Sequence, residues 1–402
     1  MKQEIIMQIS KKLPRFDDHI QLGLLDRISN FLIFVFAFIN FLSLISFSSL
    51  SIAHPSIGIE VSRLFKITII IFAISSFFLP KTPKQLIYWT VGIFFIIIDY
   101  RTNDNLTFFS ELLLLGLSVG SLRINFKKVL RLYLFSTLLG TCLIIFLSII
   151  NYLPIDGQQS SVLFSNYQNI VFCFGFVHPN AFGTALFSAT ISFLFLYSKK
   201  YKKLSIFFIL MVVFFDFLIG AQTAAVGVAI FGIGICLNYT KTQNKVNKIF
   251  KILYVLPIIL TIFSLFLAKY PNTSIYDWLN EHIASRPSLW NYYITNYPPH
   301  IFDNSIDIDL SSVNHVYGNG VLDGSYIYYL LHFGYVGLII LLLTMFAINQ
   351  KTFLTKNNLY GWSFVTICCV AFPETNFTLF FFNPFLLIFF FNQLGSEQKQ
   401  YF

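Results

Sequence analysis

Long apolar runs, separated by short clusters of charged residues, proline and asparagine, make up most of this chain of 402 residues. A helix that crosses the hydrocarbon core of a bilayer needs about 20 mostly apolar residues. Such segments recur along the chain and predict an all-α, polytopic membrane protein with about twelve transmembrane helices. They cover residues 29–52, 64–79, 85–99, 106–121, 130–152, 174–197, 204–220, 222–240, 249–268, 320–348, 358–373 and 376–392.

The basic residues predict which helix ends face the cytoplasm, because lysine and arginine collect in cytoplasmic loops. If the first helix starts on the cytoplasmic side, 22 of the 27 Lys and Arg residues fall in predicted cytoplasmic loops and tails. We therefore expect a multi-pass protein of the cytoplasmic membrane with both termini in the cytoplasm. The exceptions, on the predicted outer side, are Arg63, Lys66, Arg101, Lys269 and Arg286.

Composition and charge narrow the class of protein. With 56% hydrophobic and only 11% charged residues, the chain lies outside the range of soluble domains. The net charge of +9 follows from the cytoplasmic loops, so it does not indicate nucleic-acid binding. The cysteines form no CxxC motif, and we expect neither a disulfide nor a zinc site. All of them lie in apolar segments: Cys142, Cys173, Cys236, Cys368 and Cys369.

The predicted spans divide the chain into five parts. Residues 1–28 have no short apolar core with a small-residue cleavage site, so we expect a retained cytoplasmic tail. Helices 1–9 occupy 29–268, a large outer loop covers 269–319, helices 10–12 occupy 320–392, and 393–402 form a second cytoplasmic tail. The aromatic and amide side chains of the large loop suit either a sugar-binding rim or an interfacial aromatic belt.

Two polar turns lie at predicted outer helix ends. In the first, His178-Pro179-Asn180 opens the sixth span. His178 could bond a phosphate or a sugar hydroxyl or carry a proton, or it could only cap the helix. In the second turn, Gln222 and Thr223 lie at the junction of spans seven and eight.

The large loop and the start of the tenth span hold the other candidate residues. Arg286 is the only arginine of the loop, and its planar guanidinium could grip phosphate oxygens or form only a surface salt bridge. Asp323 opens the tenth span, where it could accept a proton from an attacking hydroxyl or only cap the helix. Trp290 and Tyr326 accompany them as candidate substrate contacts.

Three further loop residues carry weaker signals. His315 is a lesser candidate for substrate binding. Asp307-Ile-Asp309 has the DxD spacing with which many glycosyltransferases hold a divalent metal and a diphosphate. Because three letters are a weak signal in a loop rich in Asp and Ser, we assign no metal site.

These motifs, in this order, resemble the Wzy-type polysaccharide polymerases of the O-antigen ligase and polymerase superfamily, over roughly residues 165–340. Asp323 stands where the ligases have a histidine, as is usual for polymerases of capsules and exopolysaccharides. Ala221-Gln222-Thr223 departs from the Ser-Arg-Thr often found there, which removes one arginine expected to grip the diphosphate. The motifs are the glycine-flanked 178–180, the turn 220–224, Arg286-x-x-x-Trp290, and Asp323-Gly-(nine residues)-Gly334-x-x-Gly337.

The resemblance implies a GT-C-like fold and a metal-independent glycosyltransferase. It would polymerise undecaprenyl-diphosphate-linked repeat units into O-antigen, capsule or exopolysaccharide at the outer face. Arg286, with His178, would stabilise the departing diphosphate, and Asp323 or His178 would activate the acceptor hydroxyl. Asn180, Gln222, Thr223, Trp290, Tyr326 and His315 would bind substrate. No cofactor is implied; the partners are the lipid-linked oligosaccharide, membrane lipid, and a flippase and chain-length regulator of the same pathway.

Three alternatives remain open from the sequence. A ligase would transfer the glycan to another acceptor with the same fold and donor. A non-enzymatic flippase of lipid-linked oligosaccharides would carry charged residues along a central cavity, but Glu111 is the only acid well within a predicted span, and Asp99 and Asp216 lie near outer ends. A membrane O-acyltransferase would need a membrane histidine, for which His332 is the nearest candidate.

Overall fold

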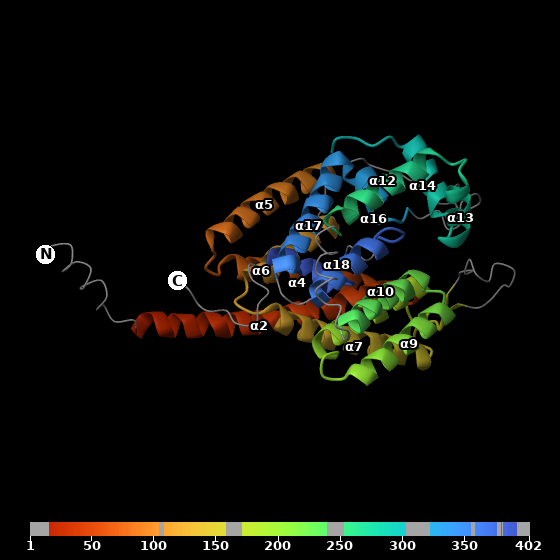
Figure 1. Cartoon of the computed structure of the whole chain (residues 1–402). Helices are drawn as coiled ribbons and strands as arrows, with labels where there is room; N and C mark the ends of the chain where they lie inside the picture. The colour runs from red at the N-terminus through yellow and green to blue at the C-terminus, as the bar shows by residue number, and fades with distance from the viewer. Residues whose placement is uncertain are drawn as a thin grey trace.

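The protein is a bundle of α-helices (Figure 1). The computed structural model describes residues 16–103, 108–157, 171–238, 253–302, 322–354, 358–375, 379 and 381–391. Its one strand ladder in these residues is the short antiparallel pair β1 (Asp156–Gly157) and β2 (Val171–Phe172). The helices are α2 (Phe16–Ser46), α3 (Leu50–Ala53), α4 (Pro55–Phe77), α5 (Pro83–Asn103), α6 (Phe108–Ser121), α7 (Phe126–Ile149), α8 (Pro179–Tyr197), α9 (Lys202–Leu218), α10 (Gln222–Asn238), η2 (Leu253–Val255), α12 (Leu256–Lys269), α13 (Ser274–His282), α14 (Arg286–Asn296), α16 (Ser325–His332), α17 (Gly334–Leu354), α18 (Asn358–Val370) and η4 (Pro384–Phe390).

Several helices are long and apolar enough to cross a bilayer, which confirms an all-α membrane protein. In the described parts of the chain, four helices meet that test: Gly23–Ser46, Phe126–Ile149, Pro179–Tyr197 and Gly334–Thr352. A fifth span is possible if α12 and α13, bent by 102° at the break between them, count as one. The predicted total of about twelve spans exceeds this number.

The predicted tenth span is broken in the structure. Residues 320–348 were expected to form one helix, but α16 ends at His332 and α17 begins at Gly334. Gly334 has φ +67, which a right-handed helix cannot continue. A Cβ at this position would lie 2.3 Å from the carbonyl oxygen of Phe302. The helix is therefore interrupted where the chain lies against the carbonyl groups of residues 300–302.

The first and last predicted spans also differ from the structure. Helix α2 begins at Phe16, so the predicted cytoplasmic tail 1–28 ends in helix. The segment predicted as a twelfth span, 376–392, contains η4, a buried 3-10 helix of 7 residues that begins with Pro384. Lys351 donates to the carbonyl oxygens of Ile388 and Phe389 at the end of η4. The described part of this segment is therefore packed inside the protein and is not a spanning α-helix.

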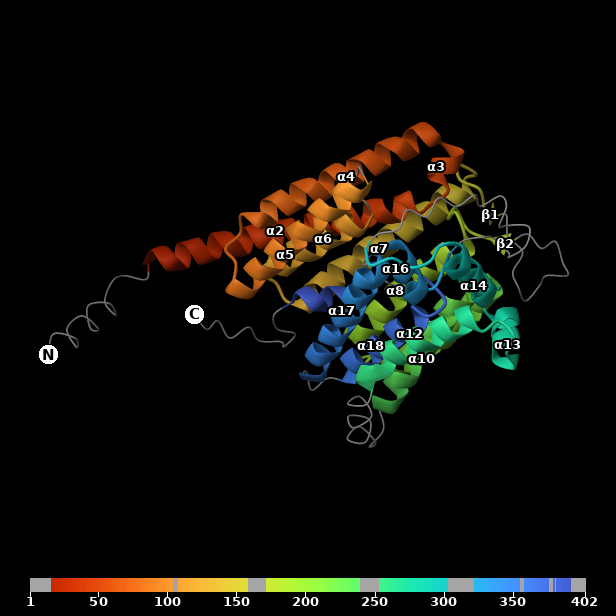
Figure 2. The same ribbon diagram turned by 90° about the horizontal axis from the view of Figure 1, so that it is seen from above.

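The helices pack in layers and form an elongated bundle, whose two ends are made of different elements. Helix α2 packs against α4 and α7, α7 against α8, and α10 against α8, α9 and α18. Figures 1 and 2 show the start of α2 at one end of the molecule and α13 and α14 at the other. At this second end a small aromatic cluster joins α12, α14 and α16 around Trp290 and Tyr293. That cluster supports the polar site described next.

Candidate active site

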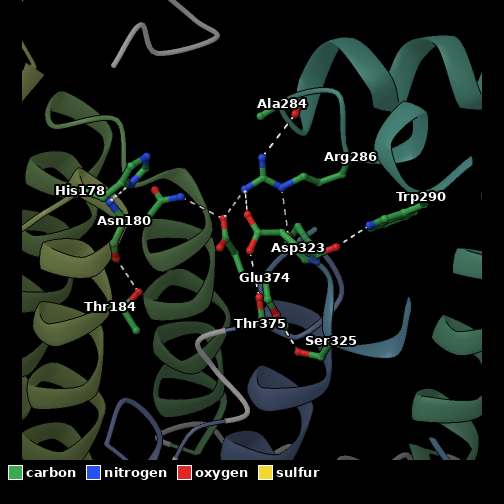
Figure 3. A network of polar contacts seen from close by, with 11 residues as sticks. His178, Asn180, Thr184, Ala284, Arg286, Trp290, Asp323, Ser325, Glu374 and Thr375 are labelled. Carbon is green, nitrogen blue, oxygen red and sulfur yellow. Dashed lines mark hydrogen bonds and ion pairs between the residues drawn. The ribbon is translucent and has the colours of Figure 1, made fainter. Parts of the chain in front are cut away.

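A buried polar cluster forms where the starts of α8, α14 and α16 meet the chain just after α18 (Figure 3). Its central residues are Asn180, Arg286, Asp323, Glu374 and Thr375. Three of them, Asn180, Arg286 and Asp323, belong to separate candidate motifs of the sequence. The fold brings these motifs together.

Arg286 lies at the centre of the cluster as the first residue of α14. The chain reaches it through two residues with positive φ, Ala284 (φ 52) and Ser285 (φ 58), and Pro287 favours a helix start after it. Its Nη2 donates to Oδ2 of Asp323 at 2.6 Å and to Oε1 of Glu374 at 3.1 Å. The side chain is only 7% exposed. Arg286 is therefore a buried ion-pair partner, and the alternative of a surface salt bridge is wrong.

Asp323 is held from several sides. Its Oδ2 accepts from Arg286, its Oδ1 accepts from Thr375 Oγ1 at 2.9 Å, and its carbonyl oxygen accepts from Trp290 Nε1 at 2.5 Å. Helix α16 starts at Ser325 with Gly324 as its N-cap. The alternative that Asp323 only caps this helix is therefore wrong, because its carboxylate points into the cluster.

Glu374 and its neighbour Thr375 are the members of the cluster that the sequence motifs did not include. Glu374 Oε1 accepts from Arg286 and from Asn180 Nδ2 at 3.0 Å, and the Glu374 carbonyl oxygen accepts from Ser325 Oγ at 2.7 Å. One signal could have found it: Glu374 is a lone acid between predicted spans eleven and twelve. The alternation of spans places that junction on the same side as His178 and Asp323.

The charges of the cluster do not balance when every group is ionised, because one guanidinium faces two carboxylates. Burial raises the pKa of Glu374, and the neighbouring Asp323 raises it further, while Arg286 opposes both. For Arg286, burial lowers the pKa, but the two carboxylates outweigh it and raise the pKa above its ordinary value. Arg286 therefore stays charged, and Glu374 takes up a proton more readily than a free glutamate does.

His178 lies beside the cluster and caps α8. Its Nδ1 accepts the backbone N–H of Asn180 at 2.9 Å, so the structural role that the sequence left open is present. Burial lowers the pKa of His178 to about 4, with Asp323 raising and Arg286 lowering it. The imidazole is therefore neutral near pH 7, and the acceptor role of Nδ1 leaves its proton on Nε2. His178 can donate a hydrogen bond but offers no positive charge to a diphosphate.

Two predicted substrate contacts are packed inside the protein. Trp290 is fully buried, and its ring lies edge-on against Phe372 at 5.4 Å between centroids. Tyr326 is also buried and donates to the carbonyl oxygen of Cys368 at 3.1 Å. Both side chains position Asp323 and its helix, and neither has an open ring face for a sugar.

The other candidates lie apart from the cluster or outside the described residues. Gln222 and Thr223 are half-buried at the start of α10, which packs against α8, and their role in substrate binding stays a prediction. His315, Asp307 and Asp309 lie outside the residues that the structure describes. His332 ends α16 against Tyr328, with 4.2 Å between ring centroids. Within the described residues, no group of three or more His, Cys, Asp and Glu could hold a metal ion.

Comparisons with protein-family models, with curated proteins and with solved structures find no match to this chain. The sequence motifs and the geometry of the cluster therefore indicate what chemistry this chain can carry out.

Proposed function

We propose that the chain is a GT-C-type glycosyltransferase that polymerises lipid-diphosphate-linked oligosaccharides at the outer face of the cytoplasmic membrane. One observation supports this most: Arg286 and Asp323, 37 residues apart, form a 2.6 Å ion pair in a buried cluster. The resemblance assigns these two residues to the diphosphate and to the acceptor hydroxyl respectively. Their contact puts both proposed roles within reach of a single substrate.

The proposed reaction is a single displacement at the anomeric carbon of the donor glycan. A hydroxyl oxygen of the acceptor attacks that carbon, and the bond from the carbon to the diphosphate oxygen breaks with its electron pair. The hydroxyl proton passes to a carboxylate of the cluster. Arg286 stabilises the charge that develops on the diphosphate, because a guanidinium presents two donors to phosphate oxygens.

The predicted topology agrees with a reaction at the outer face of the membrane. The starts of spans six and ten and the end of span eleven all face outward in the proposed arrangement of about twelve spans. They correspond to the start of α8, the start of α16 and the end of α18, which meet at the cluster. Lipid-linked repeat units presented at that face would approach the same end of the bundle.

A second candidate, a flippase of lipid-linked oligosaccharides, is favoured by one observation. Arg286, Asp323 and Glu374 are ionisable groups enclosed within a helical bundle, and such groups often mark a transport path in membrane proteins. This candidate predicts transbilayer movement of the lipid without any new glycosidic bond.

The experiment incubates the detergent-purified protein with synthetic undecaprenyl-diphosphate repeat units and EDTA and separates the products on a gel. A ladder of glycan lengths supports the polymerase. Transfer to a different acceptor would support a ligase, and lipid movement in liposomes without transfer would support the flippase. Arg286→Ala should abolish the ladder, whereas Arg63→Ala, an exposed arginine in an ion pair of equal length, should keep it.

A further inference from the structure

We propose that Glu374, through its Oε2 atom, is the base that accepts the proton of the attacking hydroxyl. This inference rests on the proposed glycosyl transfer and names the group that the sequence motifs leave undecided. It follows from which carboxylate oxygens and ring nitrogens of the cluster already accept a hydrogen bond and which do not.

Asp323, the base candidate from the sequence, has both carboxylate oxygens engaged. Oδ2 accepts from Arg286 Nη2 at 2.6 Å, and Oδ1 accepts from Thr375 Oγ1 at 2.9 Å. Each oxygen of Asp323 therefore already accepts a hydrogen bond, and neither is left over for a substrate hydroxyl. Asp323 therefore suits the task of orienting Arg286.

Glu374 has one oxygen fixed and one available. Oε1 accepts from both Arg286 and Asn180, and in Figure 3 the dashed lines to the carboxylate end on one oxygen. Among the described residues no hydrogen bond reaches Oε2, and the side chain as a whole is 6% exposed. The two donors thus fix the carboxylate and leave its second oxygen able to accept a further hydrogen bond.

His178, the other base candidate, has its basic nitrogen occupied. Because Nδ1 accepts the N–H of Asn180, the neutral ring carries its proton on Nε2. A ring in this tautomer donates from Nε2 and cannot receive a proton there. His178 therefore suits a hydrogen bond to a phosphate or sugar oxygen.

Proton transfer to Glu374 also balances the charge of the cluster. Before the step, Arg286 faces two carboxylates; afterwards it faces Asp323 and a neutral carboxylic acid. The acceptor O–H bond breaks, its proton binds Oε2, the new glycosidic bond forms, and the diphosphate leaves with the electron pair. Loss of one competing negative charge strengthens the attraction of Arg286 for the departing diphosphate.

The experiment measures the polymerisation rate of the full-length protein with synthetic lipid-diphosphate repeat units as a function of pH. The variant Glu374→Gln keeps an acceptor oxygen for Arg286 and Asn180 but removes the base. We expect its rate to fall by about 10²–10⁴-fold with KM for the donor little changed. Glu60→Gln, an exposed glutamate, is the matched control and should keep the wild-type rate.

The pH dependence of the rate shows whether Glu374 acts as a base or only stabilises the structure. The charged groups that face Glu374 are Arg286 on α14 and Asp323 before α16. From α8, the uncharged amide of Asn180 donates to its Oε1. In the wild type, the rate should rise with pH with a midpoint above the ordinary glutamate pKa of 4.5. This limb should be absent in Glu374→Gln and should persist with a shifted midpoint in Glu374→Asp.

Two outcomes would overturn the assignment of Glu374. One is a Glu374→Gln rate within about twofold of the wild type; the other is loss of the pH limb in Asp323→Asn but not in Glu374→Gln. If Glu374→Gln fails to fold, shown by its unfolding temperature in detergent, the Glu374→Asp profile decides by itself. Failure of the wild type to make any ladder would instead contradict the proposed function.

Discussion

Two ion pairs of equal length lie in two different regions of this molecule. Arg63 and Glu60 on α4 are 2.6 Å apart with side chains 62% and 66% exposed. Arg286 and Asp323 are also 2.6 Å apart, but their side chains are only 7% and 14% exposed. An exposed pair contributes about 0–1 kcal/mol, whereas removal of one partner of a buried pair costs about 3–5 kcal/mol. The burial of the charged side chains, and not the distance between them, therefore distinguishes the candidate active site from a surface ion pair.

The two pairs also differ in how the chain makes them. Arg63 and Glu60 are three positions apart on one helix, so local geometry alone brings them together. Arg286 and Asp323 come from α14 and from the chain before α16, and Glu374 joins them from the end of α18. Such a cluster exists only if the tertiary structure holds all three segments.

The largest expected effect follows from removal of each arginine. Arg286→Ala leaves two carboxylates buried without their cation and should lower the free energy of unfolding by about 3–5 kcal/mol. Arg63→Ala should change it by about 0–1 kcal/mol. Denaturation in detergent, followed by circular dichroism, measures both. Equal losses in the two variants would refute the contrast between the pairs.

The next effect comes from the backbone that carries Asp323. Gly324 has φ +92, and a Cβ there would lie 2.7 Å from Trp290 Cζ2 and 2.9 Å from the carbonyl oxygen of Phe372. Gly324→Ala should therefore cost about 1–3 kcal/mol of unfolding free energy and reduce polymerisation. Gly23→Ala, where a Cβ meets nothing within 4 Å, should be neutral or slightly stabilising. An unchanged unfolding midpoint for Gly324→Ala would contradict the close packing.

Double-mutant cycles compare the pairs directly. We expect Arg286→Ala combined with Asp323→Asn to reveal a coupling free energy of about 0.5–3 kcal/mol. For Arg63→Ala combined with Glu60→Gln, about 0.3–0.5 kcal/mol is typical of neighbouring residues on a helix. The same denaturation measurement on the single and double variants gives both values. Added salt should weaken only the exposed pair appreciably, because buried charges are poorly screened.

The smallest expected effect is a pH dependence of stability. The pKa of Glu374 is raised in the folded protein, so its protonation favours folding. The stability it contributes is fully present below its ordinary pKa of 4.5 and is lost as pH rises through its folded pKa. Glu374→Gln should therefore become more stable than the wild type as pH increases towards about 8. His178 titrates in both proteins, so it cancels in the difference of unfolding temperatures; a constant difference would exclude the raised pKa.

For the long helices, the sequence predicted that a helix forms more accurately than where that helix begins and ends. Apolar runs predicted α7, α8 and α17 as helices able to span a bilayer, because burial in lipid depends on local composition. The same reasoning failed at Gly334 and at 376–392. A positive φ and a buried 3-10 helix depend on neighbouring segments, here the carbonyl groups of residues 300–302 and the side chain of Lys351.

For the site, the sequence by itself determined the chemical types and the predicted membrane side of Arg286, Asp323 and His178. It could not select between a site and a surface contact for Arg286, or between a base and a helix cap for Asp323. Those choices depend on burial and on partners far along the chain. Only the tertiary structure brought Arg286 and Asn180 to Glu374, because hydrogen bonds between residues 88 and 194 positions apart leave no periodic pattern in a sequence.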